Sequence, residues 1–401
     1  MGTTSSEVVM FDFSTPVNRY GTYCTQWDYV QDRFGAADLL PFTISDMDFE
    51  TAPCIIDALQ NRLGHGVLGY SRWNHNDFKQ AITGWFAQRY QATLDQEAVV
   101  YGPSVIYIIS QLVNLWTQPG DGVLIHTPAY DAFGNMLTAN QRELFASPLL
   151  KTANGSYAID WEQFEEQAAR PECKVLLLCS PHNPTGRVWR EEELVQMARI
   201  CHQHGVKVIS DDIHMDMAFK RYIPWSQVAT TPHWAIVSSG SKSFNIPALT
   251  GAYAIIADPE ARADYLTQLK AAHGLSSPSI LGVIAHISAY RDGSEWLDAL
   301  KTYLHQNLSF VAEQLNQHCP AVNYQLPEGT YLAWIDLNPL HIDMDALQQI
   351  LINDYKVAIM RGDTYGPEGI GYVRLNVGCP RSKVETGINA LIGAIKQLQQ
   401  H

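Results

Sequence analysis

Short, unbroken apolar runs alternate with helical patterns through the middle of the chain. Five runs predict strands buried on both faces, at residues 123–126, 174–179, 206–210, 234–238 and 251–256. Residues 191–204 predict a helix, because apolar residues recur there at the i, i+3, i+4, i+7 spacing of one buried stripe. Acidic residues begin this helix and Gly205 follows it, as is typical of helix ends. The alternation predicts an α/β fold with a mostly parallel central sheet flanked by helices.

The pattern changes after about residue 295. The later residues predict helices at 296–317, 345–355 and 383–399 and strands at 331–337, 357–360 and 372–376. We therefore expect a large domain over residues 56–295 and a smaller α+β domain over residues 296–401. Residues 1–55 are irregular and interrupted by proline, and we expect them to pack on the small domain.

Composition narrows the class of protein. The 401 residues are 46% hydrophobic and 17% charged, which is typical of a globular chain long enough for two domains. The net charge of −14 disfavours nucleic acid and membrane surfaces as partners. Seven cysteines without CxxC spacing predict reduced, buried thiols in a cytoplasmic protein, with no disulfide framework and no metal site.

The N-terminal pattern predicts neither a secretory signal nor a membrane-spanning helix. Met1, Gly2 and Ser6 fit a myristoylation pattern only loosely, and we set that pattern aside. We expect residues 2–6 to be a frayed end, and Met10 is an alternative start.

Polar residues follow three of the predicted strands. The segment 180–186 contains Asn183, the segment 211–214 begins with Asp211, and the segment 239–245 contains Lys242 between two serines. Ligands of open α/β sheets bind beyond the carboxyl ends of the strands. We therefore expect an amide, a carboxylate and an amine to face one crevice.

This set of groups suits one cofactor. A lysine amine forms a Schiff base with an aldehyde, and a carboxylate keeps a pyridine nitrogen protonated. An amide can donate to a phenolate oxygen, and serine hydroxyls with backbone N–H groups can hold a phosphate. Together these groups indicate a site for pyridoxal 5′-phosphate (PLP).

Each of these residues has an ordinary structural interpretation when it is taken alone. Such a lysine is usually solvated, an Asn-Pro-Thr-Gly sequence is usually a turn, and an aspartate in this position can cap a helix. Tyr130 could be a core residue and Arg374 half of a surface ion pair. All of these interpretations would have to hold together by coincidence, so we favour the shared site. We assign no role to His182.

Four motifs in order give the chain a family resemblance. They are NPTG at 183–186, DDIH at 211–214, SGSK at 239–242 and VRLN at 373–376. In this order they resemble the fold-type I PLP enzymes of the aspartate aminotransferase superfamily, and the resemblance covers nearly the whole chain.

The resemblance implies roles for individual residues. Lys242 would carry PLP as a Schiff base and move protons during catalysis. Asp211 would pair with the pyridine nitrogen, and Asn183 would donate to the phenolate oxygen. The remaining implied roles are phosphate binding by Ser239, Ser241 and the N–H groups of Ser104 and Val105, ring stacking by Tyr130, cofactor contact by His214, and binding of the substrate α-carboxylate by Arg374.

The resemblance also implies a homodimer with shared active sites. Tyr70, which we place with Arg374 among the substrate-binding residues, would reach the phosphate in the neighbouring subunit's site. Two positions depart from the superfamily pattern. Thr250 stands where an arginine often binds the phosphate, and Arg361 stands where a proline usually begins the loop after the strand 357–360. Arg361 could loosen that loop or add a cation near the substrate.

A finer resemblance points to one reaction. Residues 45–49 and 212–216 resemble the MalY/PatB-type branch of cystathionine β-lyases, and residues 25–30, 101–107 and 240–253 favour its MalY side. That branch implies a PLP-dependent carbon–sulfur β-lyase acting on cystathionine and other cysteine thioethers. It also implies direct contact with MalT, the activator of maltose genes. The alternatives are an aminotransferase on the same scaffold and a regulatory binding protein that retains PLP.

Overall fold

The computed structural model describes residues 11–401 of the chain, so the expectations for Met1 to Met10 lie outside the described residues. Its larger sheet has seven strands in the order β2-β10-β9-β8-β7-β3-β4. The strands are β2 (Val99–Gly102), β3 (Gly122–Thr127), β4 (Glu143–Pro148), β7 (Cys173–Cys179), β8 (Lys207–Asp211), β9 (Trp234–Ser238) and β10 (Ala252–Ile256). Pairing is parallel from β9 across to β4, and β10 is antiparallel to both of its neighbours. The predicted mostly parallel sheet is confirmed.

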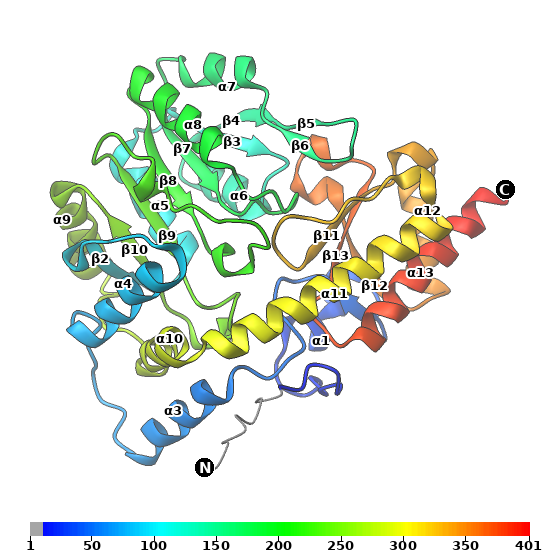
Figure 1. Ribbon diagram of the computed structural model, residues 1–401, viewed down its shortest axis with the longest axis horizontal. Helices are drawn as coiled ribbons and strands as arrows, with labels where there is room; N and C mark the ends of the chain where they lie inside the picture. The colour runs from blue at the N-terminus through cyan, green and yellow to red at the C-terminus, as the bar shows by residue number, and fades with distance from the viewer. Residues whose placement is uncertain (1–10) are drawn as a thin grey trace, which may run out of the picture.

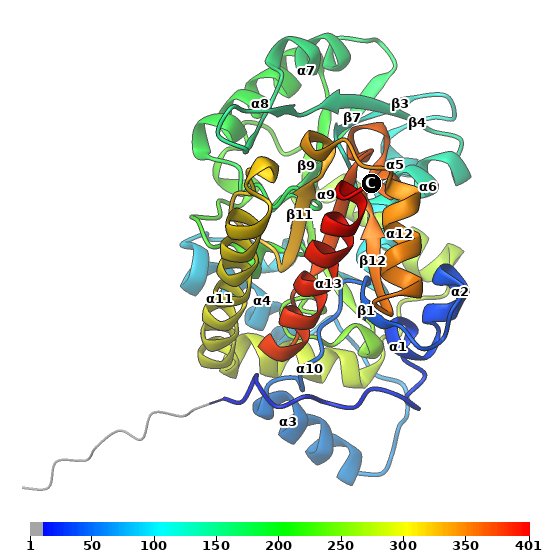
Figure 2. The same ribbon diagram turned by 90° about the vertical axis from the view of Figure 1, so that its right-hand side faces the viewer.

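Helices cover both faces of this sheet (Figures 1 and 2). α5 (Val105–Trp116) and α6 (Asp131–Ala139) lie on one face, and α7 (Trp161–Ala168) and α8 (Glu191–His204) lie on the other. α8 has the predicted bounds, and Gly205 ends it in the left-handed conformation, where its N–H reaches the carbonyl oxygens of the last turn. The other helices of this part of the chain are α3 (Pro53–Gly64), α4 (Asn76–Tyr90), α9 (Pro259–Thr267) and α10 (Ile280–Asp292), and α3 packs on α10 away from the sheet.

A second sheet of four strands has the order β1-β12-β13-β11. Its strands are β1 (Leu40–Phe42), β11 (Leu332–Asp336), β12 (Val357–Arg361) and β13 (Tyr372–Asn376). The helices near it are α1 (Thr25–Asp28), α2 (Val30–Phe34), α11 (Ser294–His318), α12 (Met344–Asn353) and α13 (Arg381–Gln399), with a separate hairpin of β5 (Leu150–Lys151) and β6 (Tyr157–Ala158). β1 pairs in parallel with β12, which brings residues near the N-terminus beside residues near the C-terminus. The domain limits at residues 55 and 295 stay predictions.

The strand register determines where the polar residues emerge. Cys179 of β7 lies beside Asp211 of β8, and Asp211 lies beside Val237 of β9. The three loops that follow these strands therefore leave the same edge of the sheet, as the sequence predicted. Within residues 11–401, no helix is both long and apolar enough to cross a membrane.

Candidate active site

A cavity of about 500 Å³ lies at this edge of the large sheet, where the small sheet faces it. Every predicted site residue except Tyr70 lines the cavity. These residues are Ser104, Val105, Tyr130, Asn183, Asp211, His214, Ser239, Ser241, Lys242 and Arg374. The structure thus brings together residues that lie far apart in the sequence.

Lys242 lies in the loop that follows β9. Its side chain is half-buried, and Nζ donates to the backbone carbonyl oxygen of Ser45 at 3.2 Å. Burial and the positive charge of Arg374 together lower the pKa of Lys242 to about 8, while the negative charges of Asp46 and Asp211 oppose this shift. The amine is therefore held neutral more readily than an exposed lysine, which favours it as a nucleophile and as a proton acceptor.

Asp211 ends β8 and is buried. Its carboxylate accepts a hydrogen bond from the N–H of Ile213 at 3.1 Å, and within residues 11–401 no cation forms an ion pair with it. Burial raises the pKa of Asp211 to about 7, while the charge of Lys242 opposes this shift. A buried carboxylate without a cationic partner suits a protonated ring nitrogen.

Because Asp211 is buried, ionising its carboxyl should lower the free energy of unfolding of the cofactor-free protein, and this effect should depend on pH. The carboxyl of Asp211 has a folded pKa of about 7 against an ordinary value of 3.8, so folding favours the protonated form. The free energy of unfolding therefore falls as pH rises from about 4 to about 7, by roughly 1.4 kcal/mol per unit. We expect Asp211→Asn to stabilise the cofactor-free protein by on the order of 2–4 kcal/mol at pH 8 and by less at pH 5. Urea denaturation measures both values, and an equal gain at both would contradict the argument.

Arg374 lies in β13 of the small sheet and joins the two halves of the site. Its Nη1 donates to Asn183 Oδ1 at 3.1 Å, and its Nη2 donates to the Thr43 carbonyl oxygen at 2.8 Å and to Ser45 Oγ at 3.3 Å. The Nε–H is buried and has no hydrogen-bond partner in the described chain. A surface ion pair is therefore the wrong interpretation of this residue. Its free donor is available to a substrate carboxylate.

The turn around Ser239 is held by contacts that the sequence did not predict. Ser239 Oγ donates to the Gly251 carbonyl oxygen at 2.8 Å, and the Gly240 N–H donates to His286 Nε2 at 3.0 Å. Because the Ser239 hydroxyl hydrogen is already used, donation to a phosphate here falls to Ser241 and to backbone N–H groups. Thr250 also lines the cavity and has a positive φ of 58°.

Ser104 begins α5, where its Oγ accepts from the N–H of Tyr107 at 3.1 Å. Ser104 and Val105 line the cavity, and phosphate binding by the N–H groups of this first turn stays a prediction. Tyr130 lies between β3 and α6 and is 38% exposed, so its ring is not a core residue. Its stacking role stays a prediction.

His214 is buried in the floor of the cavity. Burial lowers the pKa of His214 to about 3, and the charges of Lys242 and Arg374 act in the same direction, so the ring is neutral. Its Nδ1 has no hydrogen-bond partner among the described residues. Tyr331 packs edge-on against this ring and donates to the Ser45 carbonyl oxygen at 2.7 Å, the same oxygen that accepts from Lys242. No motif in the sequence marked Tyr331 as a site residue.

Two residues that the sequence singled out lie outside this cavity. Tyr70 is 99% exposed and does not line it. Arg361 follows Met360 in β12, and because side chains alternate along a strand, it points to the opposite face. It forms ion pairs with Asp345 and, at 3.1 Å, with Asp363. Arg361 therefore adds no cation to the site.

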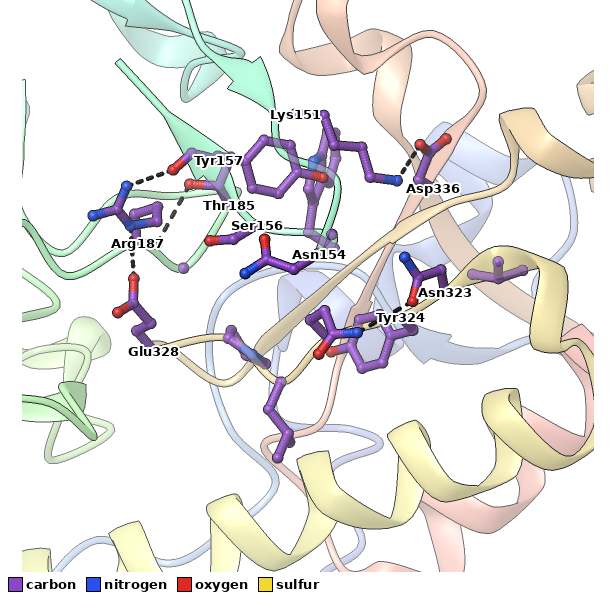
Figure 3. A pocket seen from close by; sticks show the side chains of 17 residues that line it. Lys151, Asn154, Ser156, Tyr157, Thr185, Arg187, Asn323, Tyr324, Glu328 and Asp336 are labelled. Carbon is purple, nitrogen blue, oxygen red and sulfur yellow. Dashed lines mark hydrogen bonds and ion pairs between the residues drawn. The ribbon is translucent and has the colours of Figure 1, made fainter.

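A second cavity, of about 220 Å³, lies between the β5–β6 hairpin and the loop before β11 (Figure 3). Its charged groups are already paired: Lys151 with Asp336 at 2.5 Å, and Arg187 with Glu328 at 2.6 Å. No predicted site residue lines it. We therefore locate the chemistry in the first cavity.

The residues of the first cavity fit PLP. An unpaired buried carboxylate, a half-buried amine of lowered pKa and a helix N-terminus are the three groups that its pyridine, aldehyde and phosphate require. The unpartnered Nδ1 of His214 and Nε of Arg374 are further polar atoms that a bound cofactor and substrate could satisfy.

Fold and site together define a chain built like the fold-type I PLP enzymes. A sequence model described as "Aminotransferase class I and II" matches residues 37–391, and the chain belongs to this family.

The chain is also similar to individual proteins of known name. The chain is 57% identical to Protein MalY of Escherichia coli (strain K12) over 392 residues, which covers 97% of this chain and 100% of MalY. It is 34% identical to cystathionine beta-lyase PatB of Bacillus subtilis (strain 168), with coverage of 96% and 100%. The PLP-bound carbon–sulfur lyase of Staphylococcus hominis has a similar structure, with a TM-score of 0.90, 28% identity and coverage of 96% and 98%.

Proposed function

We propose that this chain holds PLP on Lys242 and acts as a carbon–sulfur β-lyase. It would split cystathionine and related cysteine thioethers, with water, into a thiol, pyruvate and ammonia. The observation that carries the proposal is that Lys242, Asp211 and Arg374 line one cavity, with the amine neutral enough to accept a proton. The likeness to MalY, to PatB and to a PLP-bound carbon–sulfur lyase supports the choice of reaction.

Each residue would contribute a definable step. Bound PLP supplies an electron-poor ring that stabilises negative charge at the substrate Cα. Asp211 would keep the ring nitrogen protonated, and the resulting cation would hold the Asp211 carboxylate in its ionised form. Arg374 would bind the α-carboxylate and so fix the direction of the Cα–H bond. Lys242 would then remove the Cα proton, because its amine lines the same cavity as Arg374 and has a lowered pKa.

The outcome depends on the substituent at Cβ. A thiolate is a stable anion, so it can leave once the Cα proton has been removed, and elimination then precedes transfer of the amino group. An aminotransferase on this scaffold would instead need a keto acid as second substrate. Purified protein incubated with PLP and L-cystathionine should release pyruvate without an added keto acid. Turnover that requires a keto acid would favour the aminotransferase.

Arg374→Gln tests how the substrate is held. Charge-assisted hydrogen bonds contribute about 1.5–3 kcal/mol, so we expect KM for L-cystathionine to rise roughly 10- to 100-fold. The visible absorbance of bound PLP should remain, because this variant keeps Lys242 and Asp211. A KM equal to that of the unmodified enzyme would count against the assigned role.

We also propose a homodimer whose active sites share residues. Residues 65–71 form no helix or strand, and Val67, Leu68 and Tyr70 in this segment are 62–99% exposed. Exposed apolar side chains in one segment are typical of an interface. Because Tyr70 does not line this chain's own cavity, we place it at the partner's site.

Mixed dimers test that arrangement. Lys242→Ala and Tyr70→Ala should each impair turnover strongly when present in both subunits. In a mixed dimer one site has both defects and the other has neither, so unfolding and refolding the two variants together should restore part of the activity. A mixture that stays as impaired as its components would exclude sharing of Tyr70 between subunits.

Two further proposals rest on composition and likeness. We infer a cytoplasmic location, because all seven cysteines are free and six of them are buried. We also propose contact with MalT, on the strength of the 57% identity to MalY. Since this contact would not use the amine of Lys242, Lys242→Ala should still restrain MalT-dependent transcription. Loss of restraint in a correctly folded variant would tie the contact to catalysis.

A further inference from the structure

Five charged residues line the active-site cavity: Arg33, Asp131, Asp211, Lys242 and Arg374. The proposed function uses Asp211, Lys242 and Arg374 for the cofactor and for the reacting amino-acid group. Arg33 and Asp131 remain, with opposite charges and no assigned role.

Arg33 is an exposed cation on α2 without a carboxylate partner. Its one polar side-chain contact among the described residues is from Nη1 to Met360 Sδ at 3.2 Å, and a thioether sulfur is a weak acceptor. No carboxylate lies within ion-pair distance of it in residues 11–401. Met360 lines the same cavity, and its partner across the strand pair is Arg374.

Asp131 is the first residue of α6 and directly follows Tyr130. An acidic residue in a first turn suits the helix dipole, which is its simplest structural role. Its carboxylate, however, accepts no side-chain or backbone hydrogen bond in residues 11–401 and forms no ion pair there. It is half-buried and lines the cavity.

The charges of Arg33 and Asp131 both act on Tyr365. Burial raises the pKa of Tyr365, Asp131 raises it further, and Arg33 and Arg374 lower it. Arg33, Asp131 and Tyr365 all line the same cavity, and the Tyr365 ring covers the Arg374 guanidinium at 4.9 Å. Arg33 and Asp131 do not pair with each other, so a ligand carrying both charges could satisfy both.

We propose that Arg33 and Asp131 form a subsite for the leaving-group end of the substrate. Arg33 would bind a second carboxylate, and Asp131 would accept a hydrogen bond from a second ammonium. The preferred substrate class is then a thioether in which both sides of the sulfur are α-amino acids. This assignment rests on the proposed function, because it takes Arg374 and Lys242 as the groups that hold the reacting end.

Substrate pairs test the subsite through selectivity. L-Cystathionine has the second amino-acid group and S-ethyl-L-cysteine lacks it, so the ratio of their kcat/KM values reports on the leaving-group end alone. Arg33→Gln and Asp131→Asn should each lower this ratio about 10-fold or more. Arg361→Gln is the matched control, since Arg361 neighbours Met360 but points away from the cavity, and it should keep the ratio of the unmodified enzyme. Equal losses on both substrates in Arg33→Gln and Asp131→Asn, or an unchanged ratio, would overturn the subsite.

A binding measurement separates this inference from the proposed reaction. L,L-Diaminosuberate replaces the cystathionine sulfur with carbon and cannot lose a thiolate, and L-aminooctanoate has the same chain length without the distal groups. Calorimetry on the holoenzyme should show that diaminosuberate binds at least about 10-fold more tightly, and that Arg33→Gln removes the difference. Equal affinities in the unmodified enzyme would overturn the subsite. If no pyruvate forms from either thioether while the two analogues still bind unequally, the reaction is wrong and the subsite holds.

Discussion

Replacing Lys242 with alanine is expected to abolish pyruvate release from L-cystathionine, with a loss of roughly 10³-fold or more. The reason is that one amine both attaches the cofactor and removes the Cα proton. No other lysine lines the cavity, so within residues 11–401 no second amine is placed to replace it. The visible absorbance that the protein gains with PLP should disappear as well, which a spectrum of the dialysed holoenzyme measures.

Lys220→Ala is a matched control for this loss. Lys220 is an exposed lysine on the same part of the chain and lies outside the active-site cavity, so its replacement should leave absorbance and turnover as they are. If the Lys242→Ala variant retained turnover in a preparation free of host enzyme, the proposed role of the amine would be refuted. Lys242→Arg separates charge from chemistry, because arginine keeps the charge but stays protonated and cannot act as the base.

The second large effect is expected from Asp211→Asn. Without a carboxylate the ring nitrogen loses its proton, so the ring no longer stabilises negative charge at Cα, and kcat should fall about 10²- to 10³-fold. PLP should still attach to Lys242, so the absorbance should persist with a shifted maximum. Steady-state kinetics on L-cystathionine measure the loss.

Asp211→Asn also separates function from stability. The same substitution that reduces turnover should make the cofactor-free protein more stable at pH 8, because it removes a buried carboxylate without a cationic partner. Asp212 is a useful comparison, since it is also buried but accepts hydrogen bonds from Ser210 and Tyr222. A turnover rate for Asp211→Asn equal to that of the unmodified enzyme would contradict the pairing with the ring nitrogen.

Regular, fully buried elements were predictable from the sequence. β9 and β13 have the predicted bounds, and α8 begins and ends where its acidic first turn and Gly205 indicated. The antiparallel direction of β10 was not predictable, because an apolar run buried on both faces has the same pattern in either direction. β1 was missed because it has three residues and contains Pro41, and it is a strand only through its pairing with β12.

Some features of the site could likewise be predicted from the sequence, and others could not. Side chains that follow strands in sequence could be placed together by the strand-end rule, and the structure brings Asn183, Asp211 and Lys242 to one cavity. The carbonyl oxygen of Ser45 accepts hydrogen bonds from both Lys242 and Tyr331. This role could not be predicted from the sequence, because every residue has a backbone carbonyl group whatever its side chain. The outward direction of Arg361 could have been predicted from strand alternation, once Met360 was known to face the site.

The attachment point of the cofactor is the most direct test of this account. Borohydride treatment of the holoenzyme, followed by proteolysis and mass spectrometry, identifies the residue that carries PLP. We predict that the added mass is found on the peptide containing Lys242 and on that peptide alone. A label on a different lysine, or a protein that takes up no PLP, would contradict the account.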